Sequence, residues 1–261
     1  MYKIIAIDFD GTLLNDKKKV THKTKKILKK CKQKKYLIVA LTARNLSSVK
    51  SVTSIKLFDY LLLNNGTYLY DVNKNIGKNN SILEKYEYTN IIDDLKEVAK
   101  QILIISSNNY YIYKGEKQNK LSFVKKIDKL EQIQEPINRM NIVLTNQEKI
   151  NYYNNLIRNK YKNVNCFIMQ DSNSSLKRLS INPKGVNKAS ALENLGKDLN
   201  IKLKEMVFFG DGLNDLEVME KVGCSVAMEN ALEEVKNKAK FITKSNNDNG
   251  VAIYLEKILN E

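Results

Sequence analysis

The chain has 261 residues, of which 43% are apolar and 28% are charged, a balance typical of a folded globular protein rather than a disordered one. Its apolar stretches are far shorter than the ~18 residues that a membrane-spanning helix requires, so we expect no membrane partner. The net charge of +15 is spread along the chain instead of forming one basic tail, so we expect no specific nucleic-acid partner.

The cysteines and the single histidine argue against a secreted, disulfide-bonded protein and against a zinc protein. Cys31, Cys166 and Cys224 are odd in number and widely spaced, which is typical of free thiols in a reducing compartment. The sequence reaches Asp8 after only a few apolar residues, too soon for a secretory signal, so we expect a cytoplasmic protein. A zinc site has little support, because His22 lies in a lysine-rich stretch.

The first eighty residues alternate between strand and helix patterns. Short apolar, β-branched runs predict strands at 3–7, 37–42 and 59–63, and amphipathic spacing predicts helices at 21–34 and 46–55. Such alternation predicts a parallel sheet with right-handed crossovers.

From about residue 81 the pattern changes. Helical spacing predicts a helix over 91–102, and turn residues predict a hairpin of 103–106 with 110–113. We also expect strands at 141–144, 165–169 and 177–181 and a helix near 148–159. This stretch indicates a separate α+β domain over 81–183, closed by the turn signal Pro183-Lys184-Gly185.

The alternation then returns, with a helix at 188–199, a strand at 206–209 and short elements at 216–221, 225–228, 232–239 and 241–243. The predicted fold class is therefore α/β. A Rossmann-like parallel-sheet core would be formed by residues 1–80 and 184–261, with the α+β domain of residues 81–183 inserted between its two halves.

Two carboxylates follow the first predicted strand. Side chains repeat every second residue along a strand, so Asp8 and Asp10 would share one face at its carboxyl end, where open α/β sheets bind ligands. A solvated turn would explain Asp10-Gly11 but not Asp8, because an unpaired charge against an apolar run is costly. Two such carboxylates suit Mg²⁺, and a carboxylate can also attack phosphorus while a second one supplies a proton.

The same pattern recurs at the end of strand 206–209. There Asp211 and Asp215 follow an apolar strand and a glycine turn, although a simple Asp-rich turn with Asp211 as a helix cap is the alternative. If the two strands are neighbours in one parallel sheet, the four carboxylates meet.

Three further side chains could act on a phosphate group. Thr42 ends the second strand and could hydrogen-bond a phosphoryl oxygen, while Arg44 could bind a second oxygen or another anionic group. Lys188 opens a helix, where its ammonium could offset negative charge. Each also has a purely structural interpretation, as a strand-end or helix-capping threonine and as surface cations.

Taken together, these segments resemble the four ordered motifs of the haloacid dehalogenase superfamily of phosphohydrolases. The motifs are Asp8-Phe9-Asp10-Gly11-Thr12-Leu13, Leu41-Thr42-Ala43-Arg44, Lys188 and Gly210-Asp211-Gly212-Leu213-Asn214-Asp215. Asn64-Asn65-Gly66 and the segment from Pro183 to Leu192 further resemble the Cof-type subfamily, which carries a large α/β cap between the second and third motifs. Ala43, Asn187 and Ala189 depart from the residues frequent in the family without removing a reactive group.

The resemblance implies a role for each carboxylate. Asp8 would attack the phosphorus, and Asp10 would protonate the leaving oxygen and then activate water. Mg²⁺ would be held by Asp8, by the backbone carbonyl of Asp10 and by Asp211, while Asp215 would orient the waters of the metal. The residues that would bind the phosphoryl group or the rest of the substrate are Thr42, Arg44, Asn65, Gly66, Lys188 and Asn214.

The expected function is therefore Mg²⁺-dependent hydrolysis of small phosphorylated metabolites, such as sugar phosphates or nucleotide-related esters. A phosphomutase with the same nucleophile is the alternative among enzymes. From a different class, the chain could be a basic nucleic-acid-binding protein on an inactive scaffold, although the presence of Asp8, Asp10, Lys188 and Asp211 argues against this.

Overall fold

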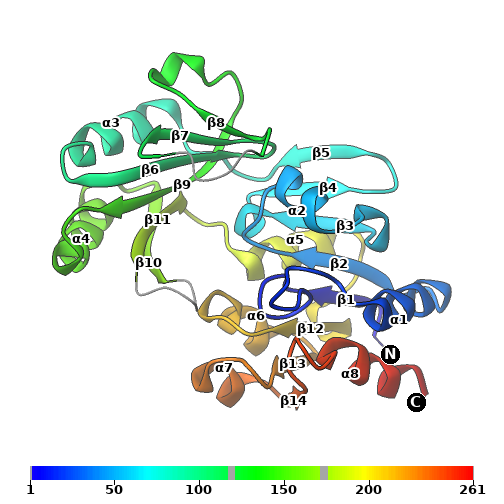
Figure 1. The fold of residues 1–261 in the computed structure, drawn as a ribbon. Helices are drawn as coiled ribbons and strands as arrows, with labels where there is room; N and C mark the ends of the chain where they lie inside the picture. The colour runs from blue at the N-terminus through cyan, green and yellow to red at the C-terminus, as the bar shows by residue number, and fades with distance from the viewer. Residues whose placement is uncertain (1, 117–120, 171–175, 261) are drawn as a thin grey trace. The chain divides into compact units, whose positions relative to one another are not determined.

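The structure, a computed structural model, describes residues 2–116, 121–170 and 176–260 (Figure 1). Its contacts divide the chain into two compact units. The core unit comprises Met1–Arg44, Val49–Asn80 and Asn187–Glu261, and the cap unit comprises Asn45–Ser48 and Ser81–Val186. No helix in the described part of the chain is long and apolar enough to cross a membrane.

The core unit contains an eight-stranded sheet in the order β14-β13-β12-β1-β2-β3-β4-β5. The strands from β14 to β3 are parallel, and β4 and β5 add antiparallel pairs at one edge. The central strands are apolar and fully buried, as expected when both faces of a parallel sheet are covered. The strand bounds are β1 (Ile4–Ile7), β2 (Leu37–Leu41), β3 (Tyr60–Leu63), β4 (Tyr68–Asp71), β5 (Ile76–Asn79), β12 (Met206–Gly210), β13 (Cys224–Met228) and β14 (Phe241–Thr243).

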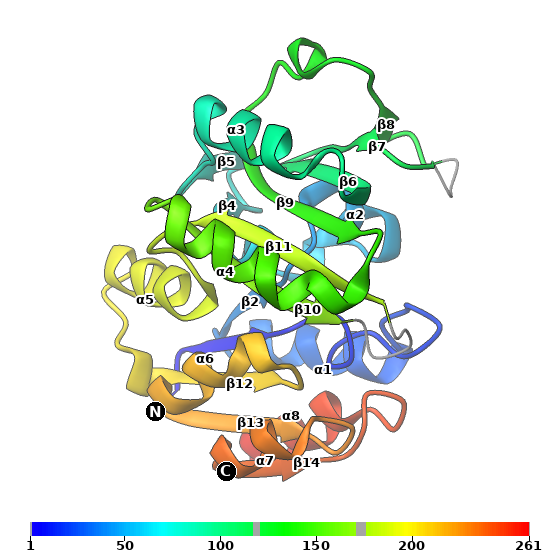
Figure 2. The same cartoon turned by 90° about the vertical axis from the view of Figure 1, so that its left-hand side faces the viewer.

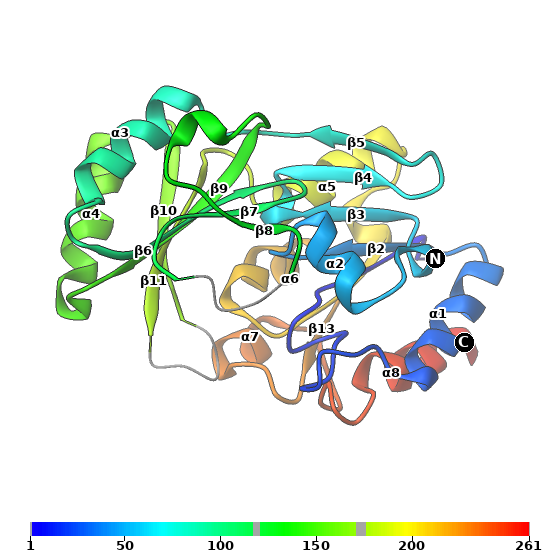
Figure 3. The same cartoon turned by 45° about the horizontal axis from the view of Figure 1, so that its top comes forward.

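Helices lie on both faces of this sheet (Figure 3), so the expected Rossmann-like core is confirmed. The helix α1 packs against α8, while α5 packs against α6 and α6 against α7. The side chain of Thr21 caps α1, which buries Ile27, Leu28 and Cys31 and leaves most of its lysines to solvent. The bounds are α1 (His22–Gln33), α2 (Leu46–Val52), α5 (Lys188–Asp198), α6 (Leu216–Lys221), α7 (Glu233–Lys238) and α8 (Gly250–Asn260).

The cap unit is an α+β layer with a six-stranded sheet in the order β10-β11-β9-β6-β7-β8. The helices α3 (Lys85–Leu95) and α4 (Ile150–Lys160) cover one face of the sheet (Figure 2) and share a buried apolar cluster with it. The strand bounds are β6 (Ala99–Ser106), β7 (Tyr110–Lys114), β8 (Val124–Lys126), β9 (Ile137–Leu144), β10 (Val164–Gln170) and β11 (Lys177–Pro183).

The helix expected over 91–102 is wrong in its bounds. The helix α3 begins earlier, at Lys85, and ends at Leu95, while Ala99 and Ile102 belong to β6. This strand pairs with both β7 and β9, so sheet pairing outweighs the helical spacing of its apolar residues. Neither β8 nor the β4 and β5 hairpin was predicted, and the outer strand of that hairpin is exposed throughout and lacks an apolar pattern.

Candidate active site

The site lies at the carboxyl ends of two neighbouring strands of the core sheet. Parallel pairing sets Ile7 opposite Phe209, and the backbone N–H of Asp8 donates to the Phe209 carbonyl at 2.9 Å. Asp8 follows β1 and Asp211 follows β12, so the polypeptide brings both carboxylates to the same edge of the sheet. The two strands on which the sequence argument depended are therefore neighbours.

Asp8, Asp211 and Asp215 form the acidic cluster. Each offers a carboxylate oxygen, and the three oxygens lie within 4.8 Å of one another. Gly11, with φ of +79°, makes room for this cluster, because a Cβ there would lie 2.1 Å from Asp211 Oδ2. Thr12 Oγ1 donates to Asp211 Oδ1 at 2.7 Å and holds that carboxylate in place.

The carboxylate of Asp215 is buried and anchored by the protein itself. Its Oδ2 accepts from the backbone N–H groups of Asp211 and Gly212, each at 3.1 Å. Its Oδ1 accepts from Lys188 Nζ at 2.6 Å. Since both oxygens already have protein donors, this arrangement fits the expected supporting role of Asp215 better than direct metal binding.

Lys188 links the nucleophile candidate to this anchor. Its buried Nζ also donates to Asp8 Oδ1 at 2.6 Å, so one ammonium holds two carboxylates from different segments. Asn187 caps α5, because its Oδ1 accepts from the Ser190 N–H at 2.9 Å, and this cap fixes Lys188 as the first helical residue. The expected placement of a cation beside Asp8 is thus present in the geometry.

The pKa values show that burial and mutual repulsion oppose ionisation of the carboxylates in the cluster. Burial raises the pKa of Asp8 well above its ordinary value, with Lys188 opposing and Asp215 and Asp211 adding to the rise. Burial likewise raises the pKa of Asp211 to about 6, although the Thr12 hydroxyl acts against it. Buried carboxylates that repel one another in this way fit a divalent cation with oxygen ligands, and Asp8 and Asp211 could supply them.

Asp10 points to a different set of partners. Arg44 donates from Nε to Asp10 Oδ2 at 2.7 Å and from Nη2 to Oδ1 at 2.8 Å, and Lys18 Nζ lies 2.8 Å from Oδ1. Burial alone would raise the pKa of Asp10, but Arg44 and then Lys18 lower it to about 2. The expectation that all four carboxylates would meet is therefore wrong for Asp10, whose carboxylate pairs with Arg44 and Lys18 instead of joining the acidic cluster. The expected contact between the metal and the Asp10 backbone carbonyl stays a prediction.

A backbone hydrogen bond joins Thr42 to the turn after β3. Thr42 is buried at the end of β2, where its Oγ1 accepts from the Arg44 N–H at 3.1 Å. The N–H of Asn65 donates to the Thr42 carbonyl at 3.0 Å, and Asn65 itself has a left-handed φ of 59°. Asn214 Nδ2 donates to Asn65 Oδ1 at 3.4 Å, so the second and fourth motifs meet through this turn.

The structure therefore brings the predicted residues together in one unit, in three connected groups. The first contains Asp8, Lys188, Asp211 and Asp215; the second contains Asp10, Arg44 and Thr42; the third contains Asn65, Gly66 and Asn214. The sequence reasoning missed Thr12 and Lys18. Thr12 lies inside the first motif but had no expected role, whereas nothing distinguished Lys18 from the lysines beside it.

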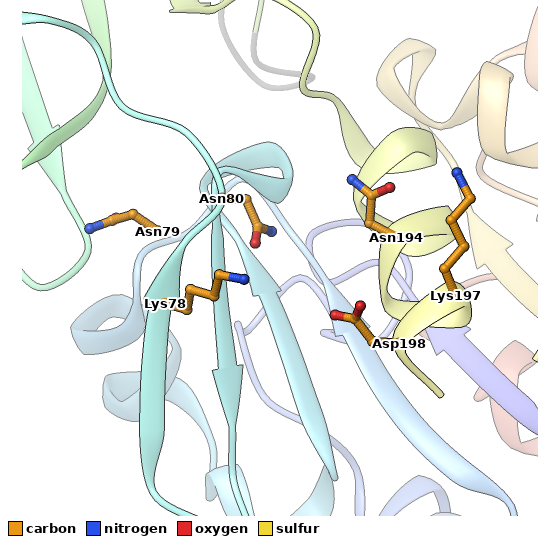
Figure 4. Close-up of a pocket in the computed structure, with 6 residues that line it drawn as sticks. All are labelled: Lys78, Asn79, Asn80, Asn194, Lys197 and Asp198. Carbon is orange, nitrogen blue, oxygen red and sulfur yellow. The ribbon is translucent and has the colours of Figure 1, made fainter. Parts of the chain in front are cut away.

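A hollow elsewhere in the core unit lacks the acidic cluster of this site. It lies between side chains at the end of β5 and others on α5 (Figure 4), and its lining contains one carboxylate and none of the motif residues. The lining residues are Lys78, Asn79, Asn80, Asn194, Lys197 and Asp198.

Comparison with known proteins identifies the family. A family model described as haloacid dehalogenase-like hydrolase matches residues 5–255. A 5-amino-6-(5-phospho-D-ribitylamino)uracil phosphatase of Bacillus subtilis is 29% identical over 251 residues, which cover 96% of this chain and 93% of that protein. A second Bacillus subtilis protein with the same named activity is 25% identical over 287 residues, covering 98% of each chain.

Solved structures agree with this assignment at the level of the fold. The crystal structure of a haloacid dehalogenase-like hydrolase from Bacteroides thetaiotaomicron has a TM-score of 0.83 and 22% identity, and the match covers 99% of this chain and 100% of that one. The chain belongs to the haloacid dehalogenase-like hydrolases. The family resemblance and the phosphatase type of enzyme expected from the motifs are confirmed.

Proposed function

We propose that the protein is a Mg²⁺-dependent phosphatase that hydrolyses small phosphate esters through an aspartyl-phosphate on Asp8. The observation that carries the proposal is the Asp8 carboxylate, which is held at 2.6 Å by Lys188 Nζ and lies within 4.8 Å of the oxygens of Asp211 and Asp215. A buried carboxylate fixed beside a cation is suited to attack an anionic phosphoryl group, because the cation offsets the repulsion between them.

Asp8 and Asp211 would hold Mg²⁺, together with the backbone carbonyl of Asp10. When bound, the ion would supply positive charge that neutralises the carboxylates and the phosphoryl oxygens. The raised pKa values of Asp8 and Asp211 support this assignment, because burial and mutual repulsion oppose ionisation of both groups.

The chain's own residues would then divide the reaction into two steps. An oxygen of Asp8 forms a bond to phosphorus while the bond to the ester oxygen breaks, and that oxygen takes a proton from Asp10. In the second step the Asp10 carboxylate removes a proton from water, whose oxygen attacks the phosphorus and frees Asp8. Throughout, Lys188 holds Asp8 in place, and Thr42 and Asn214 bind phosphoryl oxygens.

The substrate is proposed to be a small metabolite ester. Two Bacillus subtilis relatives are named for action on 5-amino-6-(5-phospho-D-ribitylamino)uracil, so this ester belongs in the panel beside sugar phosphates and nucleotides. The cap unit would supply contacts to the leaving group.

The test is phosphate release from this panel, with Mg²⁺ and with excess chelator. We expect Mg²⁺-dependent turnover, no turnover by Asp8→Asn, and full turnover by Asp198→Asn, which removes a carboxylate outside the motifs. Product analysis would separate hydrolysis from the mutase alternative, because a mutase yields a phosphorylated isomer instead of free phosphate. Unchanged activity in chelator, or in Asp8→Asn, would contradict the proposal.

A further inference from the structure

The side chain of Asp10 is held by two cations from separate segments. Arg44 binds both carboxylate oxygens, at 2.7 and 2.8 Å, and Lys18 Nζ lies 2.8 Å from Oδ1. Hydrogen bonds between ionised partners are the stronger kind, and two bonds from one guanidinium fix the plane of the carboxylate. Arg44 was expected to bind substrate, whereas Lys18 had no expected role.

Lys18 lies in a turn that is held by its own hydrogen bonds. Asn15 organises it, because its carbonyl accepts from the Lys18 N–H at 2.8 Å and its Oδ1 accepts from the Lys19 N–H at 3.0 Å. Lys18 has a left-handed φ of 55°, a conformation that is uncommon for residues other than glycine and needs support from its surroundings. The backbone position of Lys18 is therefore specified by the turn, while its side chain is 55% exposed.

A distant segment anchors the same turn. Buried Asn246 donates from Nδ2 to the Leu14 carbonyl at 2.9 Å and to Asp16 Oδ1 at 3.2 Å. Asn247 makes two further hydrogen bonds with Asp16. Its Nδ2 donates to Asp16 Oδ2 at 2.9 Å, and its Oδ1 accepts from the Asp16 N–H at 3.1 Å. The loop between β14 and α8 thus ties down the turn from which Lys18 reaches Asp10.

From this geometry we infer that Lys18 is a positioning residue for Asp10 in the phosphatase reaction. The inference rests on the proposed function, in which Asp10 gives a proton to the leaving oxygen and later takes one from water. Lys18 and Arg44 bind the ionised carboxylate of Asp10, which is the form that takes a proton from water in the second step. Lys18 therefore supports the carboxylate that acts as the base in that step.

The experiment separates the two steps with p-nitrophenyl phosphate, because nitrophenolate leaves without a proton. We expect Lys18→Met to form the phosphoenzyme within about twofold of the wild-type rate and to hydrolyse it about tenfold or more slowly, as measured by rapid quench. Lys18→Arg, which keeps a cation, should restore much of the lost rate.

Lys17→Met is the matched control, because it removes the neighbouring exposed lysine of the same loop and should leave both rates unchanged. Asn247→Ala, which loosens the anchor, should reproduce the slower phosphoenzyme hydrolysis of Lys18→Met. Wild-type rates in Lys18→Met, or equal losses in both steps, would overturn the positioning role. Absence of hydrolysis by the wild-type protein with every ester would instead overturn the proposed function.

Discussion

Lys188 shows how a buried charge can be both costly and necessary. Burial disfavours its ammonium, and so does its place at the first residue of α5, where the helix dipole is positive. Asp215 and Asp8 outweigh the desolvation and raise the pKa of Lys188 above its ordinary value. The lysine therefore stays charged where a substrate phosphoryl group would need a cation, and its two partners hold it there.

Substitution of Asp10 separates the two steps of the reaction. With p-nitrophenyl phosphate, Asp10→Asn should still form the phosphoenzyme, because the leaving group needs no proton. Hydrolysis of that phosphoenzyme should stall without a base to activate water. We expect a burst of about one equivalent of nitrophenol per enzyme, and intact-mass detection should find the phosphoryl group on the protein. Loss of both the burst and the phosphoenzyme would remove Asp10 from the second step.

The raised pKa of Asp211 predicts how Mg²⁺ binding depends on pH. Its folded-state pKa is raised to about 6, so between about pH 4 and 6 the folded protein binds more protons at this site than the unfolded chain. The contribution of Asp211 to stability in metal-free protein should therefore fall as pH rises through this window. Mg²⁺ binds the ionised form, so the Mg²⁺-induced rise in melting temperature should be larger at pH 7 than at pH 4.5.

Thermal melts with Mg²⁺ and with chelator across this range provide the measurement. Asp211→Asn should abolish most of the difference between the Mg²⁺-induced rises in melting temperature at the two pH values, because the amide does not titrate. An equal Mg²⁺ effect at both pH values in the wild-type protein would contradict the assignment of Asp211 to the metal.

At the scale of elements, the turn after β3 packs unusually closely on α5. Gly66 has a φ of +96°, and a Cβ there would lie 2.5 Å from Ala191 Cβ and 2.7 Å from the Asn187 carbonyl oxygen. Gly66→Ala should therefore suffer both backbone strain and overpacking. Gly185 has a φ of +83°, but a Cβ there would meet no atom of the described residues within 4 Å, so Gly185→Ala isolates the strain alone.

We expect Gly66→Ala to lower the free energy of unfolding by about 1–3 kcal/mol more than Gly185→Ala, because only the former must displace a neighbour. Urea unfolding of both variants measures the difference. Because Asn187 caps the helix that begins with Lys188, Gly66→Ala should also reduce turnover. Equal destabilisation of the two variants would show that α5 can move away from residue 66 without lowering the free energy of unfolding.

The sequence predicted those features that depend on local chemistry. Asp8 and Asp211 could be found because each carboxylate follows a buried apolar strand, and parallel pairing then brings such strand ends together. The role of Lys18 depends on a turn held by Asn246 from far along the chain, so no local pattern could indicate it. The helix expected over 91–102 was wrong for the same reason, since partner strands decided the conformation of its second half.

At the scale of the whole molecule, the proposed specificity of the cap unit can be tested by removing it. Replacing Ser81–Val186 with a short linker keeps the acidic cluster and Lys188, all of which belong to the core unit. If the variant folds, we expect weak activity toward small activated esters and loss of discrimination among metabolites, measured as ratios of kcat/KM. Unchanged ratios would show that the core unit alone selects the substrate.

The order of the central strands also determines when the enzyme becomes active during synthesis. Strand β1 can pair with β2 early, but its other neighbour, β12, leaves the ribosome long afterwards, once the whole contiguous part of the cap unit has been made. Until then the nascent chain carries Asp8 without Lys188 or Asp215 beside it. Chains that terminate early therefore lack the assembled charge cluster, and hydrolytic activity should appear only in polypeptides that extend past the fourth motif.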